Sequence, residues 1–336
     1  MDVGTFCAQS HVLVVAGKGG VGKTTMSAAL AKMAAGAGKS VLIVELEGKS
    51  GIAAAFGRRE DLDYEEVLLA PARPGARRTA APGPTAEPTG AVRARRLTPE
   101  DALIEYLEDH GLRRVSKRLA HSGLLDVVST AIPGIRDVLV LGKVKQLERE
   151  GAADLIVVDA PATGHAITFL TSAAGLVGAA RGGPLRSQAQ DVVDLLNDPA
   201  RCRVILVTLP EDLPVSETIE SAYTLEDKAG VQLGPVIVNA CDPEPIGLER
   251  PAAEVAASAR VTLDPAHLAV LEAARQFRLA RHAVSAEQVE RLRHDLPLPH
   301  LLVPALDVDT IGPAETEVLA DALAASVSAL VPEGAG

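Results

Sequence analysis

Short, wholly apolar runs recur along this chain and alternate with longer stretches of helical period. Each run holds three to five residues and is followed by polar or glycine-containing sequence, which is typical of strands buried on both faces of a parallel sheet. The alternation predicts an α/β fold with a mostly parallel sheet covered by helices on both faces. The predicted strands are Val12–Val15, Val41–Val44, Leu155–Val158, Val204–Val207, Val236–Val238 and Leu301–Val303.

The helical stretches lie between these runs. Thr98-Pro99 is a helix start, with Thr as N-cap and Pro at the first helical position. Residues 98–150 and 166–200 form a predicted helical subdomain, interrupted at Ile132–Ile135 and near Gly183. Asp264-Pro265 caps a helix that we expect to run to about Ala283, with another from Ser285. In a last helix, Glu315–Val331, the predicted inward residues are Val318, Leu319, Ala322, Leu323 and Leu330.

Residues 70–96 break the pattern. They are rich in Pro, Ala, Gly and Arg and have Glu87 as their only acid, so we expect a mobile surface insertion within a single domain of residues 1–336. Residues 92–97 can return to the sheet as a short strand. The arginines of the insertion are expected in a solvated loop, with contact to an acidic partner as the alternative. They are Arg73, Arg77, Arg78, Arg93, Arg95 and Arg96.

Composition excludes several classes of protein. The 336 residues carry a net charge of −11, which argues against a chain-wide nucleic-acid surface. Aromatic residues make up 2% against 47% hydrophobic residues, so the core must be aliphatic. No apolar run approaches the length of a membrane span, and Met1–Gly4 is not a signal peptide. Three dispersed cysteines (Cys7, Cys202, Cys241) suit a reducing, cytoplasmic location.

A glycine-rich loop follows the first strand and opens the first helix. Its sequence, residues 17–25, keeps the P-loop spacing G-x-x-x-x-G-K-T. The backbone N–H groups are expected to cradle phosphates, Lys23 to reach the β- and γ-phosphates, and Thr24 to bind Mg²⁺. The sequence therefore predicts an ATP and Mg²⁺ site. The predicted ATP-binding residues of the loop are Gly17, Lys18, Gly19, Gly20, Val21, Gly22, Lys23, Thr24 and Thr25.

Polar residues at the ends of other strands complete the candidate site. Glu47 follows the second strand and is a candidate to orient the attacking water. Asp159 ends the Leu155 strand, as in a Walker B motif, and is expected to hold Mg²⁺ through water. Residues 160–165 suit a switch loop, in which His165 is read as a helix-start hydrogen-bond partner. Asn239 ends another strand and can read an adenine edge.

The motif G-K-G-G-V-G-K-T-T resembles the deviant Walker A of the ArsA, MinD and ParA ATPases. Asp159–His165, Ile132–Ile135 and Val238-Asn239 make the chain most similar to the ArsA family, which includes arsenite-transporting and tail-anchored-protein-targeting ATPases. The segment Glu45–Ile52 looks most like a bacterial single-domain branch. The resemblance implies a Mg²⁺-dependent, face-to-face dimeric ATPase in which a helical client- or partner-binding subdomain switches conformation.

Within that resemblance Lys18 reaches the partner's nucleotide and acts as a charge finger. Glu47 falls where the family has an aspartate, one methylene shorter, so turnover is expected to be slow. Asn239 falls on the adenine-contacting asparagine, and Pro304 is a further expected ATP-binding residue. The expected catalytic residues are Lys18, Lys23, Glu47 and Asp159.

Three alternatives remain. A metalloid-stimulated pump subunit needs clustered thiolates, which the cysteine spacing does not provide. A MinD- or ParA-like positioning ATPase needs a basic tail or patch, and Glu315–Val331 contains no Lys or Arg. A nucleotide-binding pseudo-ATPase is the third. The expected partners are a second copy or a related ATPase, and an unknown protein client or membrane partner, without nucleic acid.

Overall fold

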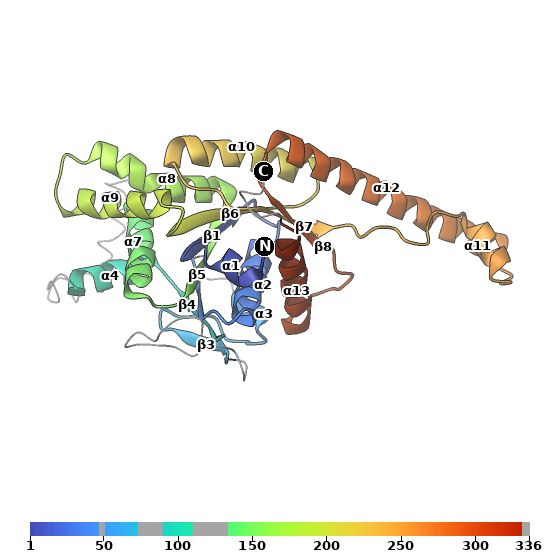
Figure 1. Cartoon of the computed structure of the whole chain (residues 1–336), viewed down its shortest axis with the longest axis horizontal. Coiled ribbons are helices and arrows are strands. Elements are labelled where there is room, and N and C mark those ends of the chain that lie inside the picture. Colours follow the sequence, from blue (N-terminus) through green and yellow to red (C-terminus); the bar gives the residue numbers. More distant parts are fainter. Residues whose placement is uncertain (47–50, 73–89, 110–133, 331–336) are drawn as a thin grey trace.

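A single sheet of eight strands forms the centre of the molecule (Figure 1). The computed structural model describes residues 1–46, 51–72, 90–109 and 134–330. The strand order is β3-β4-β2-β5-β1-β6-β7-β8, and every neighbouring pair is parallel except β3–β4. The strands are β1 (Val12–Gly17), β2 (Val41–Glu45), β3 (Val67–Ala70), β4 (Val92–Arg96), β5 (Leu155–Ala162), β6 (Cys202–Thr208), β7 (Val236–Cys241) and β8 (His300–Pro304).

The apolar runs form strands because helices cover both of their faces. In β1, Val12 and Val14 belong to one buried cluster, and Leu13 and Val15 belong to the other. All six residues of β1 are buried. The predicted α/β fold with a mostly parallel sheet is therefore confirmed.

One face of the sheet packs against α1 (Val3–Cys7), α2 (Lys23–Gly36), α3 (Gly51–Ala55) and α13 (Pro313–Ala329). In α13, Leu319 and Leu323 are buried against this cluster, as predicted. The prediction for Val318 is wrong, because its side chain is 51% exposed. Leu319, Leu323 and Val327 recur every four residues and define the buried stripe, and Val318 lies outside it.

The other face packs against α7 (Ile135–Glu150), α8 (Thr163–Ala179), α9 (Pro184–Asn197) and α10 (Asp212–Ala229). α4 (Pro99–Asp109) packs on α7, and the Asp101 N–H donates to Oγ1 of its predicted N-cap, Thr98, at 3.2 Å. Helices in 98–150 and 166–200 therefore contact each other and the sheet. That they form a switching subdomain stays a prediction, and Ile132 and Pro133 lie outside the described residues.

Part of the expected insertion belongs to the sheet. The strand predicted at 92–97 is confirmed as β4, so the solvated-loop prediction is wrong for Arg93, Arg95 and Arg96. Arg93 pairs with Glu66 at 2.5 Å, and the buried Arg95 stacks 4.4 Å from the Tyr64 ring centre. These partners come from the segment before the insertion, which the local composition could not reveal. Residues 73–89 of the insertion, with the other three arginines, lie outside the described residues.

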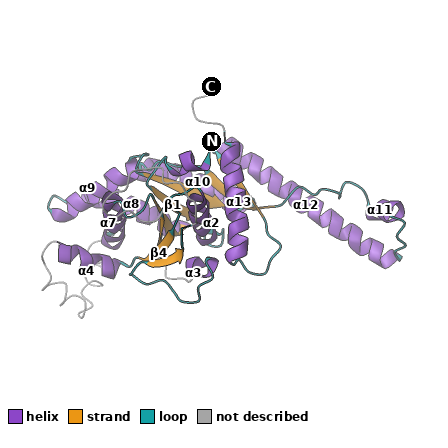
Figure 2. Ribbon diagram, turned by 60° about the horizontal axis from the view of Figure 1, so that its bottom comes forward, coloured by secondary structure: helices purple, strands orange, loops and turns teal. Residues whose placement is uncertain are grey.

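A long helical arm extends from the body (Figures 1 and 2). It consists of α12 (Pro265–Asp295), with α11 (Ala252–Ser258) packed near its far end. Asp264 caps α12 as predicted, accepting from the His267 N–H at 2.9 Å. The predicted break before Ser285 is wrong. No Gly or Pro interrupts the sequence there, and Ser285 lies buried within one continuous helix.

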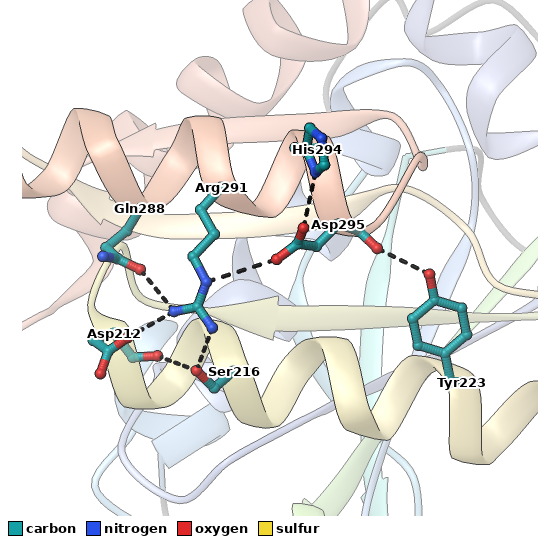
Figure 3. A network of polar contacts seen from close by, with 7 residues as sticks. All are labelled: Asp212, Ser216, Tyr223, Gln288, Arg291, His294 and Asp295. Carbon is teal, nitrogen blue, oxygen red and sulfur yellow. Dashed lines mark hydrogen bonds and ion pairs between the residues drawn. The ribbon is translucent and has the colours of Figure 1, made fainter.

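The C-terminal end of α12 is fixed to α10 by a polar network (Figure 3). Arg291 bonds Oδ1 of Asp212 at 2.6 Å and Oγ of Ser216 at 2.9 Å. At the other end of the contact, the Tyr223 hydroxyl donates to the backbone carbonyl of Asp295 at 2.9 Å. Beneath this network, Val289 and Leu292 are buried in the core. The root of the arm is thus joined to α10 by both polar and apolar contacts.

Candidate functional site

The glycine-rich loop connects the end of β1 to the start of α2. Three of its glycines have positive φ: Gly17 (154°), Gly20 (90°) and Gly22 (92°), the last being the N-cap of α2. A Cβ at Gly17 would lie 2.3 Å from the Val207 carbonyl oxygen, and one at Gly22 would lie 2.4 Å from Nδ2 of Asn239. Side chains larger than hydrogen therefore cannot occupy these positions without movement. Strand, loop and helix follow one another as the sequence predicted.

The remaining loop residues lie around the helix N-terminus. Gly19 and Gly20 are exposed, Val21 is buried, and Thr25 is half-buried in the first turn of α2. Successive N–H groups at such a terminus, with the helix dipole, favour an anionic ligand. The Lys23 ammonium donates to the Lys18 carbonyl at 3.2 Å, which folds this side chain back over the loop.

Thr24 and Asp159 meet directly. The Thr24 hydroxyl donates to Oδ2 of Asp159 at 2.7 Å, and the Ser27 hydroxyl donates to Oδ1 at 3.0 Å. Asp159 lies on β5, whose pairing with β1 brings the Walker B carboxylate beside the loop. A hydroxyl and a carboxylate oxygen are hard ligands of the kind Mg²⁺ prefers. These residues therefore fit a magnesium ion, with Ser27 as a positioning partner that the sequence reasoning missed.

Lys18 is held by its own chain. Its ammonium donates to Oε1 of Glu217 on α10 at 2.7 Å, and both side chains are about one third exposed. The other oxygen, Oε2, is buried without a hydrogen-bond partner among the described residues. Glu217 lies on α10, which follows β6, and the sequence alone does not pair it with Lys18.

A buried carboxylate that the sequence reasoning did not select lies beside Asp159. Glu45 ends β2 and is the cross-strand neighbour of Asp159 in the β2–β5 ladder. Burial, and then the negative charge of Asp159, raise the pKa of Glu45 from 4.5 to about 7. Its Oε1 is buried and has no hydrogen-bond partner in the described part of the chain. The sequence does contain a signal for this residue, because Glu45 directly follows the four apolar residues Val41–Val44 of the strand.

Asn239 joins the loop to β7. Its Nδ2 donates to the Val21 carbonyl at 2.9 Å, and its Oδ1 accepts from the Ala240 N–H at 2.9 Å. Each end of the amide keeps one further hydrogen-bonding position. Pro304 ends the neighbouring strand β8, where it pairs with Cys241. An open groove of about 450 Å³ lies beside these strand ends, between Leu209, Pro210, Ala240 and Ala305 on one side and α12 on the other.

Two predicted features differ or cannot be placed. Glu47 lies outside the described residues. The predicted switch loop 160–165 is not a loop: Ala160–Ala162 continue β5, and Thr163–His165 open α8. The Pro and Gly that suggested a loop are accommodated at the strand end and in the first helical turn. His165 is exposed there, near Asp137.

The three cysteines do not gather. Cys202 begins β6 and Cys241 ends the neighbouring parallel strand β7, so the two cysteines lie at opposite ends of these strands. Cys7 lies in α1. Burial raises the pKa of Cys7 and Cys202 to about 12 and that of Cys241 to about 11. Across the described ranges, no group of three or more His, Cys, Asp or Glu side chains could hold a metal ion.

Comparison with known proteins agrees with this geometry. The family model described as the CobQ/CobB/MinD/ParA nucleotide binding domain matches residues 12–262. The ATPase BagA of Mycobacterium tuberculosis is 38% identical over 235 residues, which are 67% of this chain and 64% of that protein. The chain thus spans slightly less than two thirds of this curated relative.

Two more distant relatives are also named as ATPases. A putative arsenical pump-driving ATPase of Halobacterium salinarum is 24% identical over 247 residues, 71% of this chain and 37% of that protein. The ATPase get3 of Schizosaccharomyces japonicus is 28% identical over 158 residues, 47% of this chain and 42% of that protein.

Proposed function

The chain belongs to the CobQ/CobB/MinD/ParA nucleotide-binding family, and on that premise we propose that it is a Mg²⁺-dependent ATPase of the ArsA type. The observation that carries the proposal is the 2.7 Å contact between Thr24 and Asp159 at the mouth of the glycine-rich loop. The two residues come from positions 135 apart in the sequence, and a phosphate-bound magnesium ion needs both. The relatives named as ATPases support the same activity.

Nucleotide binding uses this chain's backbone and four side chains. The N–H groups of Gly19–Gly22 receive the phosphates, and Lys23 leaves the Lys18 carbonyl to contact the β- and γ-phosphates. Thr24 would hold Mg²⁺ directly and Asp159 would hold it through water; the bound ion would supply positive charge beside the phosphates. Asn239 uses its remaining donor and acceptor on the adenine edge, with Pro304 close by.

Hydrolysis needs a positioned water and positive charge. Glu47 is proposed to orient the water, and Lys18 is proposed to contact the γ-phosphate across a face-to-face dimer. Lys18 must leave Glu217 to do so. The ion pair is partly buried, and we expect its rupture to cost on the order of 1 kcal/mol, the upper end of the range for surface pairs. Glu217 thereby keeps Lys18 away from the chain's own phosphate site until a partner arrives.

We propose that α8 transmits the conformational change from the nucleotide site to the surrounding helices. This helix follows directly on β5, the strand that carries Asp159, and packs against α7, α9 and α10. A change at Asp159 on nucleotide binding can therefore move the helices that cover this face of the sheet. In the proposal these helices present a surface to a protein client or membrane partner, in a homodimer or a heterodimer with a related ATPase.

The observations favour this reading over the alternatives. Dispersed thiols with raised pKa values, two of them buried, disfavour a metalloid-stimulated pump, which needs thiolates. α13 packs on α2 through Leu319 and Leu323, which disfavours its use as a membrane anchor. No helix in the described part of the chain is both long and apolar enough to cross a membrane. A pseudo-ATPase is distinguished only by assay.

The test is steady-state Mg-ATP hydrolysis by the full chain, with nucleotide binding measured separately. We expect slow hydrolysis that is indifferent to arsenite or antimonite. Lys23→Ala should abolish binding, and Lys228→Ala, an exposed lysine of α10, is the matched control. Binding without hydrolysis would point to the pseudo-ATPase. Stimulation by metalloid that is lost in Cys202→Ser or Cys241→Ser would restore the pump reading and contradict ours.

A further inference from the structure

The arm helix α12 carries an apolar stripe with coiled-coil spacing. Its members follow one another at alternating intervals of four and three residues, which keeps them on one side of a helix. The α12 stripe consists of Ala266, Val270, Ala273, Phe277, Ala280 and Val284. The next position of the repeat is Glu287, so the stripe ends where the helix joins the body.

Every member of the α12 stripe is exposed. The large side chains Val270, Phe277 and Val284 are exposed by 68%, 62% and 53%. The opposite side of the helix is covered by residues 242–258: Arg275 donates to the Leu248 carbonyl at 2.8 Å, and Glu272 accepts from the Ala252 N–H at 3.1 Å. The chain therefore covers one side of its arm and leaves the apolar side open. Large exposed apolar patches commonly mark interaction sites.

The sizes of the side chains indicate which partner fits. Large and small residues alternate strictly, with Val, Phe and Val at one heptad position and Ala at the other. If a second helix of the same sequence lies antiparallel about a two-fold axis near residue 275, each layer pairs one large residue with one alanine. Ala266 faces the partner's Val284, Val270 faces the partner's Ala280, and Ala273 faces the partner's Phe277. Facing positions that alternate in size are what close helix packing requires.

We propose that α12 pairs with α12 of a second copy of this chain in an antiparallel, two-fold symmetric seam. The contact is isologous, so one stripe serves both partners. Phe277, Ala280 and Val284, in the C-terminal half of the stripe, form one wall of the groove of about 450 Å³ described above, and Phe277 and Val284 remain more than half exposed there. This pairing uses neither Lys18 nor the phosphate loop, on which the face-to-face nucleotide dimer proposed above depends.

The charges that flank the stripe permit self-association. The positions beside it are mostly uncharged, among them Ala269, Ala274, Gln276 and Ala283. The basic side chains there have acidic partners within the chain: Arg281 pairs with Asp242 at 3.2 Å, and the His267 ring contacts the Asp264 carboxylate at 2.5 Å. Two copies therefore meet without uncompensated like charge. A membrane surface or nucleic acid would instead need a row of unmatched cations.

The length of the seam sets the expected affinity. The stripe spans about 27 Å of helix, and with a helix width of about 10 Å its footprint is roughly 300 Å² per partner. Stable complexes bury about 800 Å² per partner, so the arm seam belongs with weak, transient interfaces. We expect dissociation constants in the micromolar range or above.

Sedimentation equilibrium without nucleotide, at protein concentrations up to several hundred micromolar, tests the interface. We expect a monomer–dimer equilibrium in the wild-type chain. Phe277→Glu should weaken it at least about tenfold, because it places a charge at a central, desolvated layer. Leu271→Glu is the matched control: Leu271 is 48% exposed on the same helix but off the stripe, and it should change nothing. A monomeric wild type, or equal effects of the two variants, would overturn the proposal.

Cross-linking tests the orientation. In the antiparallel seam the two copies of residue 274 lie within about 10 Å, and the two copies of residue 283 lie about 24 Å apart along the axis. A bismaleimide spanning about 10 Å should therefore link Ala274→Cys chains and not Ala283→Cys chains. The pair should behave the same in a Lys18→Ala background, which separates this result from the nucleotide dimer. Linkage at residue 283 instead, or at neither, or only to a different protein, would contradict the seam.

Discussion

Burial of Glu45 beside Asp159 makes the stability of the fold depend on pH in a defined way. The carboxylate of Glu45 has a pKa of about 7 in the folded chain, against 4.5 for the exposed group. The folded state therefore binds the proton more tightly than the unfolded state does. Between pH 4.5 and 7 the folded chain still holds this proton, whereas the unfolded chain has lost it. The free energy of unfolding therefore falls as the pH rises through this range.

The magnitude follows from the shift. Each pKa unit corresponds to about 1.4 kcal/mol, so the full shift destabilises the folded state by about 3 kcal/mol once Glu45 is ionised. Glu45→Gln keeps the shape and one carbonyl oxygen but removes the charge. We expect the variant to gain stability relative to the wild type by about 2–3 kcal/mol between pH 5 and pH 8.

Urea unfolding at pH 5 and pH 8, followed by circular dichroism without nucleotide, measures this difference. Glu60→Gln is the control, because Glu60 is an exposed glutamate of the same region with a side chain that is 86% accessible. Its effect should not change between the two pH values. If Glu45→Gln shifts stability equally at both pH values, or if its advantage is larger at pH 5, the argument from burial is wrong.

Three further predictions concern the loop and Lys18. Gly22→Ala should reduce ATP affinity at least about tenfold by calorimetry, because its Cβ would lie 2.4 Å from Asn239 Nδ2 at a φ of 92°; Gly36→Ala, with open space around it, should leave affinity unchanged. Lys18→Ala should lower turnover roughly 10³-fold while nucleotide still binds, and unchanged turnover would remove its catalytic role. Glu217→Gln should promote ATP-dependent dimer formation about two- to fivefold in light scattering, and weaker dimers would show that the ion pair does not oppose closure.

The sequence predicted the sheet and the phosphate loop because both are defined by residues that are close together in the sequence. A buried parallel strand is a short apolar run, and the loop is defined by glycines at fixed spacing. Val12–Val15 and residues 17–25 therefore fell where they were expected. The Thr24–Asp159 contact also followed, since a carboxylate that ends a neighbouring strand reaches the same edge of the sheet.

What was missed depends on contacts between distant segments. Glu217 holds Lys18 from a different helix, and Arg95 lies against Tyr64 rather than in solvent. Serine favours helix caps, and the sequence predicts a helix start at Ser285, but Val289 and Leu292 are buried and the helix continues through Ser285 into the core. Local preference is weak where tertiary packing competes with it.

Because α12 is long and anchored at one end, a small rotation at that end produces a larger displacement at the other. It is 31 residues long, and about 20 of them extend beyond its anchored end, a reach of about 30 Å. A rotation of only about 5° at Arg291 would displace the far end by about 3 Å. Arg291 is bonded to α10, the helix that holds Lys18 through Glu217. A small rearrangement near the phosphate loop can thus be amplified into a displacement of about 3 Å at the far end of α12.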